Sequence, residues 1–194
     1  MSDTWRVFCA IDLPQDLKQK LAIHIGQLKN ATGVKTGWTP VDNIHLTIKF
    51  LGNIPTSVVE KLSHAAASAV QSLSPFKLRA EHCGAFPGHG PPRVLWIGIT
   101  DKSGQLTRLH TLLDEECASL GFPKESRPFH PHLTLARVRH PAGARPLAAA
   151  HRALEFSPVE FDVTELVVIR SELGQGGSKY TTISRHAVGA HPLD

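Results

Sequence analysis

The sequence predicts an α+β protein with a mostly antiparallel sheet, arranged as two similar lobes. Apolar residues recur at helical spacing in some segments and alternate with polar residues in others. The resulting helices and strands do not follow the regular β-α-β order of a doubly wound fold. The second half of the chain repeats the kinds of element found in the first. We therefore expect one bilobal domain over residues 1–194.

Each expected element rests on a local pattern. Apolar runs or strict alternation indicate strands, and apolar residues three and four positions apart indicate helices. Ser57 and Glu60 have the spacing of a capping box, which typically opens a helix. The expected strands are residues 6–13, 44–51, 76–83, 93–100, 132–138, 160–170 and 179–186, and the expected helices are residues 17–28, 57–73, 106–120 and 147–154.

The composition is that of a globular protein, with 41% hydrophobic and 20% charged residues. The formal net charge of +4 is too small for a protein that coats nucleic acid. Cys9, Cys83 and Cys117 are widely spaced, which argues against a disulfide framework or a CxxC site and favours a reducing, cytoplasmic compartment. No stretch has the roughly 18 apolar residues of a membrane span, and residues 1–13 lack the features of a signal peptide.

The twelve histidines are the unusual part of the composition, because imidazole titrates near neutrality and is the most frequent acid/base group in enzymes. Walker-type, GxGxxG, HExxH and GxSxG motifs are absent. The tetrapeptides HLTI and HLTL, which begin at His45 and His132, share the pattern His-x-Thr-x with apolar x. About one His-x-Thr sequence is expected by chance in a chain of this composition. The two motifs are significant because each half of the chain has one copy, and each copy lies inside an expected strand.

Residues i and i+2 of a strand lie on the same face. His45 and Thr47 therefore share one face, as do His132 and Thr134, while the apolar x residues face inward. If the lobes face one another, a groove is lined by two histidines and two threonines. Two histidines on opposite sides of a bound group can act as general base and general acid. The hydroxyls, with nearby Arg or Lys, can hold an anion.

Other interpretations stay open at this stage. The His-x-Thr faces are also typical of an ordinary solvated sheet. His130 and His132 with a third ligand would form a metal site, although no carboxylate or thiol stands nearby at ligand spacing. Alternation places Phe50 in the core and Lys49 on the face of His45. Packing roles are expected for Trp38 and Trp96, and surface positions for His24, His64, His110, His140, His151, His186 and His191.

At these residues the sequence resembles the two-histidine (2H) phosphoesterases, in particular the LigT-like RNA 2′,3′-cyclic phosphodiesterases of the 2′-5′ RNA ligase family. The resemblance covers nearly the whole chain, about residues 6–186. Besides the two motifs, it is carried by the segments RVFCAIDLP, TPVDNIHLTIKFLGNI, FP with PRVLW, RPFHPHLTLAR, and SELG with GSKY.

The resemblance implies two pseudo-symmetric lobes, each an antiparallel sheet with helices packed outside, around a central cleft. Members of the family open the 2′,3′-cyclic phosphate at an RNA end to leave a 2′-phosphomonoester, without a metal or nucleotide cofactor. We therefore expect a metal-independent, cytoplasmic, monomeric hydrolase that acts on RNA 2′,3′-cyclic phosphate ends or cyclic nucleotides.

Carried onto this sequence, the resemblance makes His45 the proton donor to the departing 3′ oxygen. His132 becomes the acceptor that activates water. Thr47 and Thr134 would bind the non-bridging phosphate oxygens in the transition state.

Three further residues are expected to contact the substrate. Arg137 matches a family arginine that approaches the phosphate, but strict alternation places it opposite His132, so we expect a bulge or strand end there. Lys49 and Tyr180 are the other two expected contacts. The alternative functions are a 2′-5′ ligase that joins tRNA halves and a non-catalytic module that binds RNA ends.

Overall fold

The computed structural model describes residues 3–139, 143–174 and 177–189. The helices are α1 (Gln15–Thr32), α2 (Val59–Gln71), α3 (Gln105–Ser119) and α4 (Ala144–Leu154), with short 3-10 helices η1 (Val41–Asn43) and η2 (Thr56–Val58). The strands are β1 (Thr4–Ile11), β2 (Gly37–Trp38), β3 (Leu46–Pro55), β4 (Phe76–Phe86), β5 (Val94–Thr100), β6 (His132–Arg137), β7 (Val159–Val163), β8 (Glu165–Gly174) and β9 (Gly177–Ala187).

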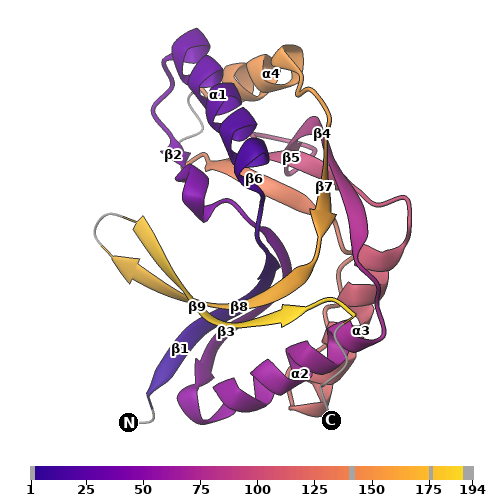
Figure 1. Cartoon of the computed structure of the whole chain (residues 1–194). Coiled ribbons are helices and arrows are strands. Elements are labelled where there is room, and N and C mark those ends of the chain that lie inside the picture. Colours follow the sequence, from indigo (N-terminus) through magenta and orange to yellow (C-terminus); the bar gives the residue numbers. More distant parts are fainter. Residues whose placement is uncertain (1–2, 140–142, 175–176, 190–194) are drawn as a thin grey trace.

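The strands form one curled antiparallel sheet. Its order is β7-β4-β5-β6-β3-β1-β8-β9, with β2 paired to β6. We call β7, β4, β5 and β6 the upper half-sheet and β3, β1, β8 and β9 the lower half-sheet, after their places in Figure 1. Within the described residues, the two are paired only where β3 meets β6, at Leu46 and Leu133. The sheet therefore bends into a C-shaped molecule (Figure 1).

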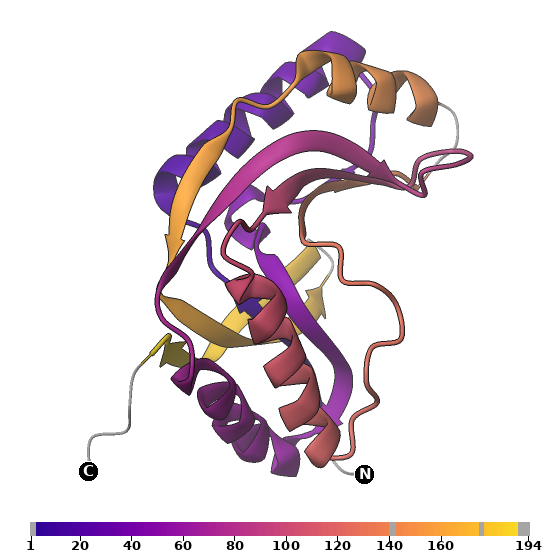
Figure 2. The same cartoon turned by 90° about the vertical axis from the view of Figure 1, so that its right-hand side faces the viewer.

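Helices cover the outer faces of both half-sheets. Helices α1 and α4 pack together over the upper half-sheet, and α2 and α3 pack together under the lower one (Figures 1 and 2). Their apolar stripes supply much of the main core, in which Leu21, Leu62 and Leu109 are fully buried. The expected α+β class, antiparallel sheet and outer helices are confirmed. None of the helices in the described part of the chain is long and apolar enough to cross a membrane.

The half-sheets are built from interleaved segments of the chain. Strand β1 and strand β3 belong to the lower half-sheet, but α1, which lies between them, covers the upper one. The two lobes are therefore not consecutive halves of the chain, as the repeated order of elements suggested. The strand expected over 160–170 is wrong for the same reason: it is two strands, β7 and β8, separated at Thr164 where the chain passes from the upper to the lower half-sheet.

Two other boundaries differ from expectation. The strand expected to end at Cys83 continues to Phe86, so the loop before β5 is shorter than expected. Ser57 and Glu60 form no capping box, because Ser57 lies within η2 and the N-cap of α2 is Val58, which makes no side-chain cap. The glycine-rich stretch 174–177, where the sequence pattern also indicates a turn, lies partly outside the described residues. All three cysteines are free.

Trp96 packs across the upper half-sheet over Gly84, its partner on β4. A Cβ on Gly84 would lie 2.1 Å from the indole ring, so the ring occupies the space of the missing side chain. This supports the packing role expected for Trp96, whose ring also contacts Phe86 at a centroid distance of 5.1 Å.

We expect Gly84→Ala to lower the free energy of unfolding by roughly 1–3 kcal/mol, because the indole must move out of a filled site. Chemical denaturation followed by tryptophan fluorescence measures this. Gly26→Ala is the matched control: Gly26 lies within α1, and a Cβ added there would meet nothing within 4 Å, so alanine stabilises the helix by roughly 0.5–1 kcal/mol. Equal effects at the two glycines would contradict the packing argument.

Candidate active site

A cleft of about 470 Å³ lies between the two half-sheets. Its lining carries three arginines and two histidines, and none of the described residues that line it has a carboxylate. The excess positive charge suits an anionic ligand. The lining residues are Arg6, Phe8, Thr39, Asn43, Ile44, His45, Thr47, Phe50, His132, Thr134, Arg137, Arg139, Ser171, Leu173, Ser178 and Tyr180.

Both His-x-Thr pairs face this cleft. His45 stands directly before β3 and Thr47 lies in it, while His132 and Thr134 lie in β6. The residues between them, Leu46 and Leu133, are fully buried on the opposite face. The structure thus brings the four motif residues together in one cleft, from one strand of each half-sheet.

The two motif histidines are held in the same way. His45 Nδ1 lies 2.8 Å from the carbonyl oxygen of Asn43, and His132 Nδ1 lies 2.7 Å from that of His130. A carbonyl only accepts, so each Nδ1 carries the proton and donates it. Nε2 of each ring is therefore the nitrogen that can take up or release a proton.

Burial lowers the pKa of both imidazoles below the ordinary value for histidine. For His45, the hydrogen bond to Asn43 and the charge of Asp12 oppose the effect, and Lys18 adds to it. For His132, the hydrogen bond to His130 opposes burial, but the charges of Arg137 and His130 lower the pKa further. Nearby charge therefore favours the protonated form at His45 and the neutral form at His132.

Aromatic rings fix the orientation of the two imidazoles. The His45 ring stacks on Phe8 at a centroid distance of 4.5 Å and meets the edge of Tyr180 at 5.3 Å. The His132 ring meets Phe86 edge-on at 5.1 Å. Tyr180 also lines the cleft, as expected, and pairs across β8 and β9 with Ser171. Each imidazole is thus held by a ring contact as well as by its backbone hydrogen bond.

A β-bulge in β3 overturns two expectations at once. Cys9 on β1 pairs with Lys49 and Ala10 pairs with Thr47, so Ile48 is the extra residue. A bulge reverses the alternation beyond it. Lys49 therefore points away from the cleft, is 8% exposed, and forms a buried ion pair with Asp114. The expected phosphate contact by Lys49 is wrong.

The bulge has the opposite effect on Phe50, which it places on the cleft face. Instead of the expected core position it lines the cleft, 50% exposed. The guanidinium of Arg6 lies 4.6 Å from the centre of its ring. An exposed aromatic face in a cationic cleft suits a nucleobase or a similar flat group.

A second bulge, in β6, was expected and is present. Leu95 pairs with Ala136 and Trp96 pairs with Thr134, which leaves Leu135 as the extra residue. Both Leu135 and Ala136 are consequently buried, and Arg137 emerges on the cleft side near His132. The placement of Arg137 beside the motif histidine agrees with the expectation from the sequence.

Several other cleft residues were not expected from the sequence pattern. Arg6 and Phe8 lie two residues apart on β1 and therefore share a face. The apolar run that follows Arg6, however, predicts a strand that is buried on both faces. Arg139 lies two residues beyond Arg137, the last residue of β6. Asn43 was missed because it acts mainly through its backbone: its carbonyl holds His45, and its side-chain Nδ2 donates to Ser178 at 2.7 Å.

Two histidines that we expected at the surface are buried. His24 is 4% exposed and His151 is fully buried, and their rings are hydrogen-bonded through His24 Nε2 and His151 Nδ1 at 3.0 Å. Helical spacing signals both positions, since each lies on the apolar face of its helix, His24 three residues after Leu21 and His151 four after Leu147. His64 is exposed as expected, His110 and His186 are half-buried, and His140 and His191 lie outside the described residues.

The alternative metal site at His130 and His132 is not formed. Within residues 3–139, 143–174 and 177–189, the only group of three or more potential ligand side chains close together is His24, Cys83 and His151. His132 Nδ1 is bound to the His130 backbone, and no third ligand joins the two rings among these residues.

Comparison with known proteins identifies the family. The chain matches the 2′-5′ RNA ligase superfamily over residues 17–175. The chain belongs to this superfamily. It is 30% identical over 194 residues to a protein named RNA 2′,3′-cyclic phosphodiesterase from Escherichia coli K12, and the match covers 97% of this chain and 99% of the relative. A protein of the same name from Geobacillus stearothermophilus is 32% identical over 178 residues, and the match covers 91% of this chain but 55%, or about half, of the relative's length.

A solved structure supports the assignment to this superfamily. The crystal structure of Escherichia coli LigT complexed with 3′-AMP aligns with a TM-score of 0.75 and 27% sequence identity, covering 97% of this chain and 100% of LigT. The expected family and fold are both confirmed by these comparisons.

The buried Lys49–Asp114 pair allows a stability prediction. Burial alone raises the pKa of the Asp114 carboxyl, but hydrogen bonds from Lys49 Nζ and the Glu125 amide outweigh burial and lower the pKa below its ordinary value. Asp114→Asn leaves the Lys49 ammonium buried without a counter-charge, so we expect a loss of about 3 kcal/mol of unfolding free energy at neutral pH. Because the folded pKa is depressed, the loss is full above about pH 4 and shrinks as the pH falls through the folded pKa.

Urea denaturation at several pH values measures this difference. Asp162→Asn is the control, since the Lys77–Asp162 pair is exposed and its loss changes stability by less than about 1 kcal/mol. The double variant Lys49→Met with Asp114→Leu should regain most of the stability. A small, pH-independent effect of Asp114→Asn would contradict the prediction.

Proposed function

We propose that this protein hydrolyses 2′,3′-cyclic phosphates at RNA ends, or in cyclic nucleotides, to 2′-phosphomonoesters. The observation that carries the proposal is the pair of imidazoles in one cationic cleft, each with Nδ1 bonded to its own backbone and Nε2 available for proton transfer. The names of the two relatives described above and the 3′-AMP complex of LigT support the same substrate class.

The reaction needs one proton acceptor and one proton donor. His132 Nε2 takes a proton from the attacking water as its oxygen bonds to phosphorus. The bond from phosphorus to the 3′ oxygen breaks, and His45 Nε2 gives its proton to that oxygen. The product is a 2′-phosphomonoester with a free 3′ hydroxyl, and the two histidines have exchanged protonation states before solvent restores them.

The charges around the two rings support these roles. Asp12 stabilises the cationic form of His45, which suits a proton donor. Arg137 and His130 disfavour the cationic form of His132, which suits a proton acceptor. The anionic substrate would raise the pKa of both rings once bound, so the donor can hold its proton in the complex.

The remaining cleft residues have the chemistry to bind the phosphate and the nucleoside. Thr47 and Thr134 would donate hydroxyl hydrogen bonds to the non-bridging oxygens, whose charge grows in the transition state. The planar guanidinium of Arg137 would neutralise this charge by donating two hydrogen bonds to the phosphate oxygens. Tyr180 supports His45, and the exposed ring of Phe50 offers a platform for a base.

The proposed function also has implications for the oligomeric state, the compartment and the RNA substrate. We infer a monomer that works in the cytoplasm as a single bilobal domain and recognises an RNA end rather than a long backbone. The net charge of +4 supports end recognition, because binding along many phosphates needs many cationic contacts. Ends of tRNA halves are one such substrate, and incubation with cyclic-phosphate and 5′-hydroxyl ends tests ligation, which would give a 2′-5′ joined product.

We expect His45→Ala and His132→Ala each to lower turnover of a 2′,3′-cyclic nucleotide by roughly 10²–10⁴-fold with the fold intact. Product analysis by phosphorus NMR should show only the 2′-phosphate from the wild type. His64→Ala, on the exposed side of α2, is the control and should retain full activity. Full activity in either motif variant, or a 3′-phosphate product, would overturn the assigned roles.

The pH dependence of kcat/KM should be bell-shaped, with its optimum below about pH 6.5, the ordinary pKa of histidine. The reason is that burial lowers the pKa of both His45 and His132 in the free enzyme. The kcat profile should lie at higher pH, because bound anionic substrate raises both pKa values. Steady-state kinetics across pH measures both profiles, and an optimum of kcat/KM well above neutrality would contradict this.

Arg137→Gln should lower kcat/KM by roughly 10- to 100-fold, the cost of losing a hydrogen bond to a charged group. It should also raise the pKa of His132, because the Arg137 charge contributes to lowering it. Arg127→Gln is the control, since Arg127 is exposed, pairs with Glu125 and lies outside the cleft. NMR titration of the His132 ring separates the electrostatic effect from a general loss of structure.

A further inference from the structure

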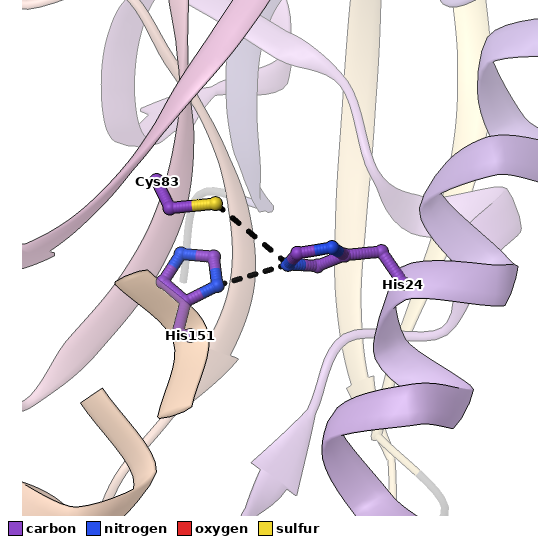
Figure 3. Close-up of side chains that lie close together, drawn as sticks. All are labelled: His24, Cys83 and His151. Carbon is purple, nitrogen blue, oxygen red and sulfur yellow. Dashed lines mark hydrogen bonds between the residues drawn. The ribbon is translucent and has the colours of Figure 1, made fainter. Parts of the chain in front are cut away.

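We propose that His24, Cys83 and His151 form a binding site for one Zn²⁺ ion on the helix-covered side of the upper half-sheet. The three side chains come from α1, β4 and α4, which are far apart in the sequence, and they converge in Figure 3. Their potential ligand atoms all lie within 4.8 Å of one another. Imidazole nitrogen and thiolate sulfur are the donors that Zn²⁺ prefers in proteins.

The hydrogen bonds of the cluster show why a metal suits it. His151 Nε2 lies 3.0 Å from the carbonyl oxygen of Trp96, which only accepts, so Nε2 carries the proton and Nδ1 has a free lone pair. His24 Nε2 must then donate to His151 Nδ1. The Cys83 sulfur, 3.9 Å from the same nitrogen, competes for the same hydrogen. The three potential ligand atoms thus converge on the N–H hydrogen of His24, the position that a cation would take.

The distances are close to those of a zinc site. Zinc binds nitrogen at about 2.0–2.1 Å and sulfur at about 2.3 Å, so ligand atoms in a tetrahedral site are roughly 3.3–3.6 Å apart. The separations of 3.0 Å between the two nitrogens and 3.9 Å between Cys83 Sγ and His24 Nε2 lie on either side of this range. All three separations are at most 4.8 Å, so side-chain rotations that shift the ligand atoms by about 1 Å would seat the ion.

A third bulge brings Cys83 to the helix-covered side. Glu81 pairs with Gly98 and Cys83 with Ile97, so His82 is the extra residue, and it has a φ of 62°. Non-glycine residues rarely adopt this left-handed conformation. Without the bulge, alternation along β4 would turn His82, not Cys83, toward α1 and α4.

The Trp96 carbonyl acts as the outer partner that metal-binding histidines usually have, because it fixes the tautomer of His151. His24 also lines an open cavity of about 350 Å³ with Lys20 and Glu155, so the cluster borders this cavity at His24. Lys20 opposes the approach of a cation and Glu155 favours it. A water molecule from this cavity would complete the four ligands.

Binding is balanced by proton movements. Burial raises the pKa of the Cys83 thiol to about 11 and lowers that of His24 to about 4, so at neutral pH the metal-free site has a protonated thiol and neutral imidazoles. When Zn²⁺ binds, the thiol proton leaves to solvent and sulfur bonds to the metal. The His24 proton moves through solvent from Nε2 to Nδ1, which frees Nε2 as a ligand.

The site is independent of the proposed catalysis. His24 and His151 lie on the helices that cover the outer face, whereas His132 faces the cleft on the other side. The ion would tie α1, α4 and β4 together and stabilise the upper half-sheet. The inference departs from the expectation that the protein holds no metal, but leaves the cleft reaction metal-independent.

The test is to titrate Co²⁺ into the full-length, untagged protein after removal of metal by a chelator. We expect one equivalent to bind, with the visible bands of a tetrahedral site and a thiolate-to-cobalt charge-transfer band, and Zn²⁺ to displace it. X-ray absorption of the zinc form should show one sulfur at about 2.3 Å and nitrogens at about 2.0–2.1 Å. Excess Zn²⁺ should raise Tm.

Cys83→Ser should abolish the charge-transfer band, weaken binding by at least about 100-fold and remove the rise in Tm. Cys117→Ser is the matched control, since that buried thiol lies outside the cluster. His24→Gln provides a second variant if Cys83→Ser does not fold. The proposal is overturned if the wild type gives no tetrahedral cobalt spectrum, if zinc absorption shows no sulfur ligand, or if His130→Asn rather than Cys83→Ser removes binding.

Discussion

The single pairing of Leu46 with Leu133 is the constraint on which the site depends. In the described part of the chain it is the only register point between β3 and β6, and therefore between the two half-sheets. Both leucines are fully buried, and each is the middle residue of a His-x-Thr triplet. Because side chains alternate along a strand, burying the leucines turns the flanking histidines and threonines into the cleft. Because the strands diverge beyond this point, the half-sheets curl apart and leave room for a ligand. The leucine between the histidine and the threonine of each motif thus joins the two half-sheets, while the histidine and threonine on either side of it line the cleft.

The bulges at Ile48 and Leu135 extend the effect of this pairing. Each lies at the residue after the motif threonine, Ile48 in β3 and Leu135 in β6, and each buries two successive residues. The reversal of alternation brings the fifth residue after each histidine, Phe50 and Arg137, to the cleft. In the lower half-sheet it also sends Lys49 into the core, where Asp114 compensates its charge. Extra residues in these strands therefore decide which side chains meet the ligand and which meet the helices.

The local sequence pattern correctly predicts the features that depend on residues close together in the chain. Helix and strand positions, and the shared face of each His-Thr pair, follow from periodicity, and they agree with the structure. Membership of a half-sheet does not follow from periodicity, since it depends on long-range pairing, which is why the pattern over 160–170 predicts one strand where there are two. The bulge in β6 was expected only because Arg137 resembles a family residue. The one in β3 has no comparable signal, so alternation places Lys49 and Phe50 on the wrong faces. The His24, Cys83 and His151 cluster needs three distant segments and a bulge at His82 to form.

The two sides of the cleft hold their histidines in the same way but differ in the charges near them. Two imidazoles fixed in the same tautomer by the same kind of backbone hydrogen bond would have no preference for giving or taking the proton. The equivalent positions two residues beyond the bulges break this symmetry, because one holds the neutral Phe50 and the other the cationic Arg137. Arg137 lowers the proton affinity of His132, and Asp12 raises that of His45. The same arginine is placed to bind the phosphate, so substrate binding and the direction of proton transfer depend on one side chain. Exchanging Phe50 and Arg137 would move the positive charge from the His132 side of the cleft to the His45 side, so it would be expected to weaken or reverse this preference while leaving both motifs intact.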